Sequence, residues 1–489
     1  MTNTNCSLLT LAVVFWAASI YSVCAADLYW DPGDDGTGGS GVWDLTLENW
    51  DDQSDGTGTQ QAWTDGETAR IGMGSHVTLG ADVETFGIEH YNAGDWSGWS
   101  ITSPQNEGNY LYTIINAGGL IGNSSLTNWG STFNVNMDIA GNTDLAVNST
   151  WNGTISGSGT VSHKASVTLN RASPNYNGVW HINKGTLTVG ADNALGNGTL
   201  ELDGINGGYG IAASGSARQL SSDIKIATWS GSGWAHQVGL SGEDLTFSGP
   251  TTFGATYSGG GVNYTMNVSN TTEFAGDMSG LAGDLIKAQS GTLVLSGNVS
   301  NSGGTQVADG ALLINGTTSG QGNYTVDSGA VLGGGGTIGL ADGNGVSVAG
   351  TLAPGSSTGT LTVEGDLALG VNSAYNWEAS SESDYDSIVI RNGVLTIDDS
   401  LAVDLATYQP VATGPTDFVL FDFTDAGASF VGNVSQWDVT LTSPFMSGTP
   451  SLSVTDDQIL LSGITFTPEP TGALLMLLVL TGLLIRRRR

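Results

Sequence analysis

The stretch WNGTISGSGTVSHKASVTLNRASPNYNGVWHINKGTLTVGADNALGNGTLELDG, residues 151–204, contains the pattern that decides the fold. Apolar and polar residues alternate in short runs, as around Leu187 and Val189, and this is the period of a β-strand. Pairs such as Asn177-Gly178 interrupt the runs and accept the positive φ that a tight corner needs. The stretch therefore predicts short strands joined by glycine-rich corners.

The same pattern returns in FAGDMSGLAGDLIKAQSGTLVLSGNVSNSGGTQVADGALLINGTTSGQGNYTVDSG, residues 274–329. Matched positions are Ile155 and Met278, Lys164 and Lys287, Ile182 and Val307, Leu187 and Leu312, and Val189 and Ile314. One such unit buries little apolar surface, whereas units stacked coil upon coil share a continuous core. We therefore predict an all-β fold, a right-handed parallel β-helix (solenoid), with an array of β-sandwiches as the alternative.

The composition of the 489 residues agrees with many short strands and bounds the function. Glycine accounts for 74 residues, 39% of the residues are apolar and only 12% are charged, which disfavours long helices and disorder. The 46 acids against 12 bases give a formal net charge of −34, and such a surface repels phosphate backbones. Nucleic-acid binding is excluded on this ground, whereas cations are attracted, with Ca²⁺ the natural one outside a cell.

The first 26 residues have the features of a secretory signal peptide. An apolar run over residues 7–23 is followed by small residues that suit cleavage after Ala26. Cys6 and Cys24, the two cysteines of the chain, lie inside the segment that cleavage would remove. The mature protein is therefore expected to be exported and to form no disulfide bonds.

Residues 467–489 combine a proline break, an apolar run and a cluster of arginines. The break is Pro468, Glu469 and Pro470, the run is Ala473 to Ile485, and the cluster is Arg486, Arg487, Arg488 and Arg489. Arginines stay on the cytoplasmic side of a membrane, so a helix over the run would hold the body of the chain outside. A run this short is marginal against a hydrocarbon core of roughly 30 Å.

In the order and placement of these parts, the segment resembles the PEP-CTERM sorting signal of exported proteins from Gram-negative bacteria that make exopolysaccharide. The resemblance implies recognition by an exosortase-type membrane protease, cleavage near Pro468 to Pro470, and transient anchoring in the inner membrane through a single C-terminal helix. A plain tail anchor that is never cut is the alternative, because hydropathy alone does not separate the two.

The copies at 151–204 and 274–329 resemble the autotransporter-associated β-strand repeat, with its order of strand, glycine-rich corner and Gly-Thr-Leu strand. Residues 336–369 and the Trp- and Asp-rich stretch 29–52 are similar to the segments that follow and precede such repeats. The resemblance implies a passenger-like solenoid with a capping head. We expect no autotransporter barrel, because residues 407–467 are too few for its strands.

These segments divide the chain into five predicted parts. They are a signal peptide at 1–26, a Trp- and Asp-rich β head or cap at 27–110, a repeat solenoid at 111–370, a closing β region at 371–466 and the sorting tail at 467–489. The solenoid is expected to be stiff, because each coil is held by the coils on either side of it.

No motif in the sequence assembles a catalytic site. GSSTG, residues 355–359, matches the nucleophile pattern G-x-S-x-G around Ser357, but every histidine precedes it, whereas the histidine follows the serine in that fold. A glycine-rich corner explains the match. A polysaccharide lyase would need a basic proton acceptor, and the candidates are Arg171, Lys184, Arg218 and Lys225. None of them lies in a sequence cluster, so we expect no enzymatic activity.

Acids and tryptophans crowd the first part of the body. The acids are Asp31, Asp34, Asp35, Asp44, Asp51 and Asp52. Their order fits no known calcium loop, so solvated surface acids are the first expectation and a Ca²⁺ site is the second, with no metal ligands assigned. Several tryptophans neighbour an acid or asparagine, as in sugar-binding sites, and Trp96 and Trp99 are the candidates for sugar contact. A cap that plugs the end of the solenoid is the favoured explanation and is compatible with sugar contact.

Three functions from different classes fit these observations. The favoured one is a non-catalytic exported protein of the cell surface or extracellular matrix, a rigid β-solenoid sorted by an exosortase-type system and associated with exopolysaccharide. The alternatives are a carbohydrate-binding adhesin and a β-helix polysaccharide lyase or hydrolase. No cofactor is expected.

Overall fold

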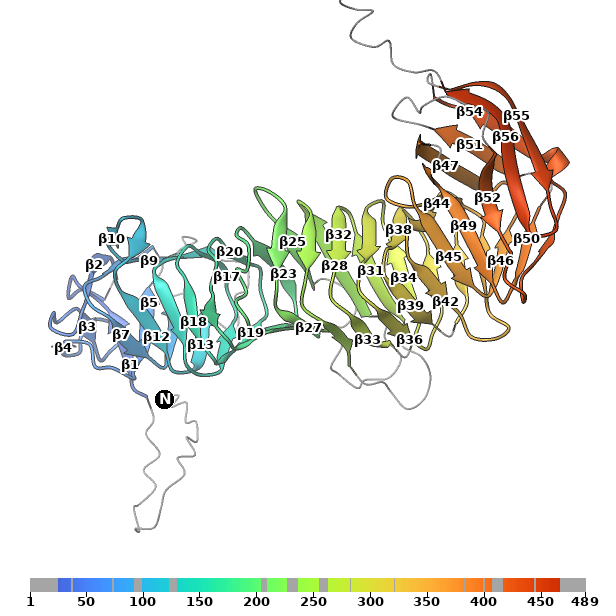
Figure 1. The fold of residues 1–489 in the computed structure, drawn as a ribbon. Helices are drawn as coiled ribbons and strands as arrows, with labels where there is room; N and C mark the ends of the chain where they lie inside the picture. The colour runs from blue at the N-terminus through green and yellow to red at the C-terminus, as the bar shows by residue number, and fades with distance from the viewer. Residues whose placement is uncertain are drawn as a thin grey trace, which may run out of the picture. The chain divides into compact units, whose positions relative to one another are not determined.

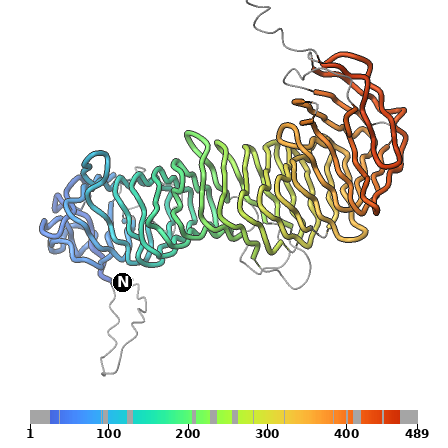
Figure 2. Tube along the Cα trace, viewed as in Figure 1, coloured from blue at the N-terminus to red at the C-terminus, as the bar shows by residue number. Residues whose placement is uncertain are grey.

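The computed structural model describes residues 25–466 apart from 37, 73, 92–98, 123–129, 204–208, 227–235, 255–262, 282, 321, 382, 399–400, 407–416 and 444–445. The chain forms two compact units, residues 1–230 with 236–254 and residues 231–235 with 255–489. The regular secondary structure of the described residues is β-strand apart from one short 3₁₀ helix, η1 (Val434–Gln436). Figure 1 shows the strands of each unit side by side in successive coils, and Figure 2 traces the chain through these coils.

The strands of the first unit form three faces, each a ladder of parallel neighbours. Face 1 consists of β1 (Asp27–Trp30), β5 (Thr68–Gly72), β8 (Gly87–Tyr91), β13 (Gly119–Gly122), β16 (Thr143–Leu145), β19 (Thr160–His163), β22 (Val179–Ile182), β24 (Thr199–Leu202), β27 (Asp223–Ile226) and β30 (Thr251–Phe253). Face 2 consists of β2 (Ser40–Trp43), β6 (His76–Leu79), β9 (Ser100–Thr102), β14 (Gly130–Asn134), β17 (Asn148–Trp151), β20 (Val167–Leu169), β23 (Gly185–Val189), β25 (Tyr209–Ala213) and β28 (His236–Gly242). Face 3 consists of β7 (Val83–Thr85), β12 (Thr113–Asn116), β15 (Asn136–Ile139), β18 (Ile155–Gly157) and β21 (Asn175–Tyr176), with β26 (Arg218–Leu220) and β29 (Leu245–Phe247) as a separate pair.

The second unit repeats the arrangement on three faces of its own. Its face 1 consists of β33 (Met278–Leu281), β36 (Val299–Asn301), β39 (Thr317–Gly320), β42 (Thr337–Gly339), β45 (Thr360–Glu364), β49 (Ser387–Arg391) and β52 (Phe418–Asp422). Its face 2 consists of β31 (Tyr264–Val268), β34 (Leu285–Ala288), β37 (Thr305–Val307), β40 (Tyr324–Val326), β43 (Gly345–Val348), β46 (Asp366–Leu369), β50 (Val394–Ile397) and β53 (Ser429–Val431). Its face 3 consists of β32 (Thr271–Phe274), β35 (Thr292–Leu295), β38 (Ala311–Ile314), β41 (Val331–Gly334), β44 (Thr351–Pro354), β47 (Ala374–Ser381), β51 (Ala402–Ala406) and β54 (Asp438–Leu441).

In both units the chain passes from face to face and returns to pair with its own previous coil. Parallel pairing between consecutive coils is the topology of a β-solenoid, so the predicted all-β parallel β-helix architecture is confirmed for each unit. An array of β-sandwiches, the alternative, would pair its strands mainly antiparallel.

The alternation read from the sequence places one row of side chains inside each coil. Ile182, Leu187 and Val189 are each 0% exposed. Register pairing stacks equivalent residues into columns, and one column of face 1 runs through Leu145, His163, Ile182, Leu202, Ile226 and Phe253. The core of each unit is therefore a bundle of aliphatic and aromatic columns rather than one central cluster.

Rows of glycine line the corners where successive coils approach closely. In the first unit one row is Gly141, Gly159, Gly178 and Gly198. A Cβ at Gly198 would lie 1.9 Å from the carbonyl oxygen of Gly178, and one at Gly178 would lie 2.0 Å from that of Gly159. Because coils stack at the strand spacing of about 4.8 Å, these corners have no room for a side chain. The requirement is for space, since none of the four has a positive φ.

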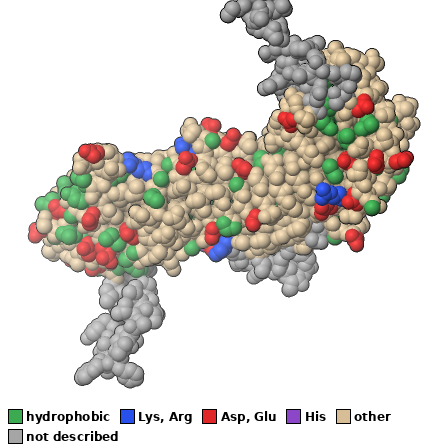
Figure 3. Space-filling view, in the orientation of Figure 1, with side chains coloured by type: hydrophobic (Ala, Val, Ile, Leu, Met, Phe, Trp, Pro, Cys, Tyr) green, Lys and Arg blue, Asp and Glu red, His purple; other side chains and the backbone are tan. Residues whose placement is uncertain are grey.

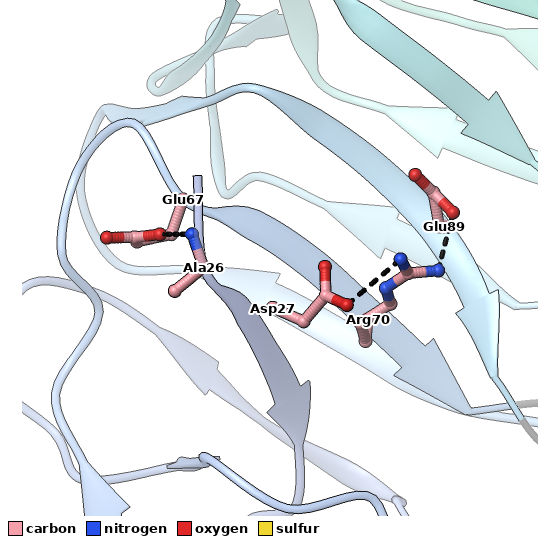
Figure 4. A network of polar contacts seen from close by, with 5 residues as sticks. All are labelled: Ala26, Asp27, Glu67, Arg70 and Glu89. Carbon is pink, nitrogen blue, oxygen red and sulfur yellow. Dashed lines mark hydrogen bonds and ion pairs between the residues drawn. The ribbon is translucent and has the colours of Figure 1, made fainter. Parts of the chain in front are cut away.

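Antiparallel strands and ion pairs close the ends of the described chain. At the start of the first unit, β1 pairs antiparallel with β3 (Trp50–Asp51), which also pairs with β4 (Gln60–Gln61). Arg70 on β5 bonds Asp27 on β1 and Glu89 on β8, and the amide of Ala26 donates to the Glu67 carboxylate (Figure 4). At the end of the second unit, the hairpin β55 (Met446–Val454) and β56 (Gln458–Phe466) pairs antiparallel with β52.

Two smaller hairpin elements project from the coils. In the first unit β10 (Gln105–Asn106) pairs with β11 (Asn109–Tyr110), and in the second β48 (Asp384–Tyr385) pairs back on β47. The predicted boundaries at residues 110 and 370 do not coincide with the division between these two units and stay predictions. The predicted C-terminal membrane helix lies outside the described residues, among which no helix has the length and apolarity to cross a membrane.

Replacing a glycine of the corner row with alanine tests the stacking. Gly198→Ala is expected to reduce the free energy of unfolding by about 1–3 kcal/mol, because its methyl group would overlap a backbone oxygen that cannot move away alone. Gly130→Ala is the matched control, since a Cβ there meets nothing within 4 Å. Chemical denaturation measures both variants, and equal losses would contradict the account of the corner.

His163 provides a test of the core by pH. Its ring is 0% exposed and burial lowers its pKa to about 4, while Nδ1 lies 2.9 Å from the carbonyl oxygen of Lys184. Between about pH 6.5 and pH 4, His163 binds a proton in the unfolded chain but not in the folded chain. The free energy of unfolding should therefore fall by about 3 kcal/mol as the pH drops through this range. His163→Leu removes this part of the pH dependence, and the exposed His76→Gln does not. Chemical denaturation at pH 7 and pH 4.5 measures the free energy of unfolding of each protein. The same change between the two pH values in all three proteins would contradict the burial of His163.

Candidate functional site

The second unit carries a shallow groove on its face 2, across strands β34, β37 and β40. Its cavity volume is about 390 Å³. The lining residues are Asn263, Asp284, Ile286, Gly304, Thr305, Gln306, Gly322, Asn323, Thr325 and Asn344. The groove crosses consecutive coils, so the solenoid repeat places similar side chains along its length.

One side of the groove is a row of corner residues that also hold the coils together. Asp284 Oδ1 accepts a hydrogen bond from Gly304 N at 2.7 Å, and Asn323 Oδ1 accepts one from Gly345 N at 2.9 Å. Short polar side chains at corners commonly bond the local backbone in this way. Each corner residue thus connects its own coil to the next, and the row runs along the stacking direction.

The other side of the groove consists of the outward positions of three paired strands. Ile286 pairs in register with Gln306, and Gln306 pairs with Thr325. Gln306 Nε2 donates to Asp327 Oδ2 at 2.8 Å, which fixes the orientation of the amide. Among the contacts within the described part of the chain, these bonds use Nε2 of the Gln306 amide and Oδ1 of the Asn323 amide.

The chemistry of this lining suits a neutral, hydroxyl-rich ligand. Amides and hydroxyls predominate, Asp284 is the one carboxylate, and no lysine, arginine, histidine or cysteine lines the described groove. Amide groups donate and accept hydrogen bonds as sugar hydroxyls require. Among the described lining residues, no histidine or lysine stands beside a hydroxyl that it could activate as a nucleophile.

Of the two tryptophans proposed for sugar contact, the structure describes one. Trp99 is 1% exposed and its ring packs edge-on against Phe133 at a centroid distance of 5.0 Å, so it is a core residue and presents no face to a sugar. Trp96 lies outside the described residues. The groove residues were missed because their signal is an Asn or Asp directly before the face 2 strand, as at Asn263, Asp284, Asn323 and Asn344. Gly304 takes this place in the coil of β37, so the pattern is interrupted.

Four other tryptophans form the cluster that a cap requires. Trp30, Trp43, Trp50 and Trp63 are at most 3% exposed, and their rings meet at centroid distances of 4.7–5.1 Å, three of the four contacts being edge to face. Such contacts stabilise a core beyond the area they bury. The cluster fills the first coils of the first unit, where β1, β2 and β3 end or begin.

Of the six acids in this region, the structure brings three together. One carboxylate oxygen each from Asp31, Asp34 and Asp51 lies within 4.8 Å of the other two. Asp44 and Asp52 instead bond nearby backbone, Asp44 accepting from Leu47 N and Asp52 from Thr59 N. Antiparallel pairing of β1 with β3 explains the gathering, because it places residues about 20 positions apart in sequence side by side.

Three of the four basic residues considered for a lyase have side-chain partners in the described structure. Arg171 donates to Gly108 O and lies over the Tyr110 ring, Arg218 donates to Ser214 O, Lys225 pairs with Glu201, and Lys184 is exposed. They are held by different segments of the first unit, and the structure shows no acid and base cluster around them among the described residues.

The corner at residues 355–359 is also structural. Ser357 is exposed, and Gly359 N donates to Oδ1 of the buried Asp386 at 2.8 Å. Burial raises the pKa of Asp386 to about 8. The second oxygen of Asp386 accepts from Glu378 N at 2.9 Å, so this carboxyl ties the corner to β47.

The remaining predicted site residues belong to the tail. Pro468, Glu469 and Pro470, together with Arg486, Arg487, Arg488 and Arg489, lie outside the described residues. Their assignment to sorting and membrane topology therefore stays a prediction.

Comparison with known proteins supports the resemblance to autotransporter repeats. No protein family model matches the chain. Over 222 residues the chain is 28% identical to the adhesin BmaC autotransporter of Brucella suis biovar 1 (strain 1330), a match that covers 44% of this chain and 6% of that protein. The chain thus matches only a small part of that relative's length. The similarity indicates an autotransporter-like β-repeat protein, which agrees with the parallel coils of both units.

Proposed function

We propose that this chain is an exported, non-catalytic protein of the cell surface or extracellular matrix that acts as an adhesin, with the face 2 groove of the second unit as its glycan-binding surface. The observation that carries the proposal is the row of amide and hydroxyl groups along the groove, free of basic residues and of any nucleophile with a base. The similarity to an autotransporter adhesin and the signal-like first 26 residues support display outside the cell.

An extended polysaccharide is the ligand class that the groove favours. Coils repeat at about 4.8 Å, so polar groups recur along the groove at a spacing comparable to the length of a sugar residue. A polyanion would meet Asp284 and a strongly acidic protein, which favours a neutral polymer. Exopolysaccharide made by the producing cell is therefore the partner that we propose.

The tail completes the proposal for localisation. Pro468 to Pro470 and the four terminal arginines support sorting by an exosortase-type membrane protease, with transient anchoring in the inner membrane before processing. We also propose that the solenoid winds in the right-handed sense predicted from the sequence, because crossovers between parallel strands are overwhelmingly right-handed.

Blocking the groove with one side chain tests the binding function. The exposed Thr325 lies between Gln306 and Ser347 in the strand register, so Thr325→Arg places a long charged side chain across the groove. Binding to the producer's exopolysaccharide is expected to weaken at least about tenfold, or about 1.4 kcal/mol. Gln219→Arg, at an exposed strand position of the first unit, adds the same charge and should bind normally.

Chromatography of the polymer with the full chain measures binding and polymer size together. The proposal requires protein and polymer to elute together and the polymer to keep its length. Shortening of the polymer would replace the binding function with an enzymatic one. Equal binding by Thr325→Arg and Gln219→Arg would place the ligand elsewhere, and no binding by the unmodified chain would overturn the adhesin function.

A further inference from the structure

Three carboxylates meet at the beginning of the first unit, where β1 ends and β3 lies beside it. Asp31 follows β1 and is 1% exposed, Asp51 ends β3 and is 0% exposed, and Asp34 is exposed on the loop that follows β1. Their nearest oxygens lie within 4.8 Å of one another. Figure 3 shows acidic side chains gathered at the end of the unit where Figure 1 places β1 and β4.

The hydrogen bonds of the cluster leave one buried oxygen without a partner. Asp31 is satisfied, since Oδ1 accepts from Asp35 N and Oδ2 from Gly36 N. Asp51 Oδ1 accepts from Gln53 N at 2.6 Å, but Asp51 Oδ2 is buried and has no hydrogen-bond partner among the described residues. A buried charged oxygen left unpaired is costly, so its presence points to a group that the protein itself does not supply.

The described residues provide no cation for this charge. Arg70, the basic residue of this region, is committed to Asp27 and Glu89 (Figure 4). The negative charge of the cluster also acts on Tyr91, whose hydroxyl donates to Trp30 O at 3.0 Å. Burial, together with the charges of Asp31, Asp51 and Asp35, raises the pKa of Tyr91 to about 12. Three carboxylates at this separation repel one another unless a cation lies between them.

We infer that Asp31, Asp34 and Asp51 bind one calcium ion, with Asp51 Oδ2 as the buried ligand and exposed Asp34 as the one that closes the site. Calcium prefers oxygen ligands at 2.3–2.6 Å, so two ligands on opposite sides of the ion lie up to about 5 Å apart, as these oxygens do. Magnesium usually keeps several waters and binds through one or two carboxylates, so a site of three protein carboxylates favours calcium. No histidine or cysteine belongs to the cluster, which disfavours zinc and copper.

The ion would connect two segments that enclose the tryptophan cluster. Asp31 and Asp51 directly follow Trp30 and Trp50, whose rings are 5.1 Å apart. Calcium between the two carboxylates therefore fastens the loop after β1 to β3 and holds the first coil closed over the tryptophans. The affinity is expected near 10⁻⁴ to about 10⁻³ M, as in extracellular calcium modules with few protein ligands.

Terbium luminescence tests the site in the full chain, because Tb³⁺ replaces Ca²⁺ and emits when a nearby tryptophan is excited. Trp30 and Trp50 are close enough in the chain to sensitise an ion held by Asp31 and Asp51. We expect emission on excitation of tryptophan, competed away by Ca²⁺ and not by equal Mg²⁺. Asp51→Asn and Asp34→Asn should each weaken Tb³⁺ binding at least about tenfold, since affinity follows the number of charged ligands.

Glu48→Gln is the matched control, because it removes one negative charge from an exposed position of the same head. It should retain the emission and the Ca²⁺ competition. Asp34 is exposed, so Asp34→Asn decides the question even if the Asp51 variant fails to fold. Absence of tryptophan-sensitised emission, or the same emission from Asp34→Asn and Glu48→Gln, would overturn the calcium site.

Discussion

Within each unit, the close approach of one coil to the next constrains everything else. Parallel strands pair at about 4.8 Å, and at the corners the backbones come so close that Gly178 and Gly198 have no room for a Cβ. The high glycine content is therefore a packing requirement. In the second unit, Gly297, Gly316 and Gly336 repeat the arrangement, each Cβ position lying 2.0–2.3 Å from a carbonyl oxygen of the coil before. A side chain at these corners would overlap the backbone of the coil before it, so the two coils could not keep their spacing there.

The same stacking turns single residues into rows and so generates the functional surface. Inside, equivalent positions form apolar columns, and a polar member such as His163 or Lys287 must be neutral or fully bonded. Lys287 donates to the carbonyl oxygens of Ala288, Gln289 and Asp309, and burial lowers its pKa to about 8. Outside, corner amides and strand hydroxyls line up across coils and form the groove of the second unit. A repeated backbone thus presents repeated polar groups, which matches a polymeric ligand better than a compact one.

The sequence was sufficient for the architecture because alternation and glycine corners are local signals. Residues such as Leu187 and Val189 face inward as their alternation predicts. The sites were harder to predict because they depend on pairing between distant segments. Asp31 and Asp51 meet only through antiparallel pairing of β1 with β3, and Trp99 is buried by the coil that follows it through contact with Phe133. Neither relation is visible in the spacing of residues along the chain.

Cross-linking of designed cysteine pairs tests the coil register most directly. In a chain with Cys6 and Cys24 replaced, Thr168→Cys with Thr188→Cys should form a disulfide, because these residues are register partners of adjacent coils. Thr168→Cys with Ala212→Cys should not, because Ala212 pairs with Thr188 and so lies one coil further, about 9–10 Å away. Mass spectrometry after mild oxidation distinguishes the two. A bond in the second pair and none in the first would contradict the stacked coils on which the groove and the core columns depend.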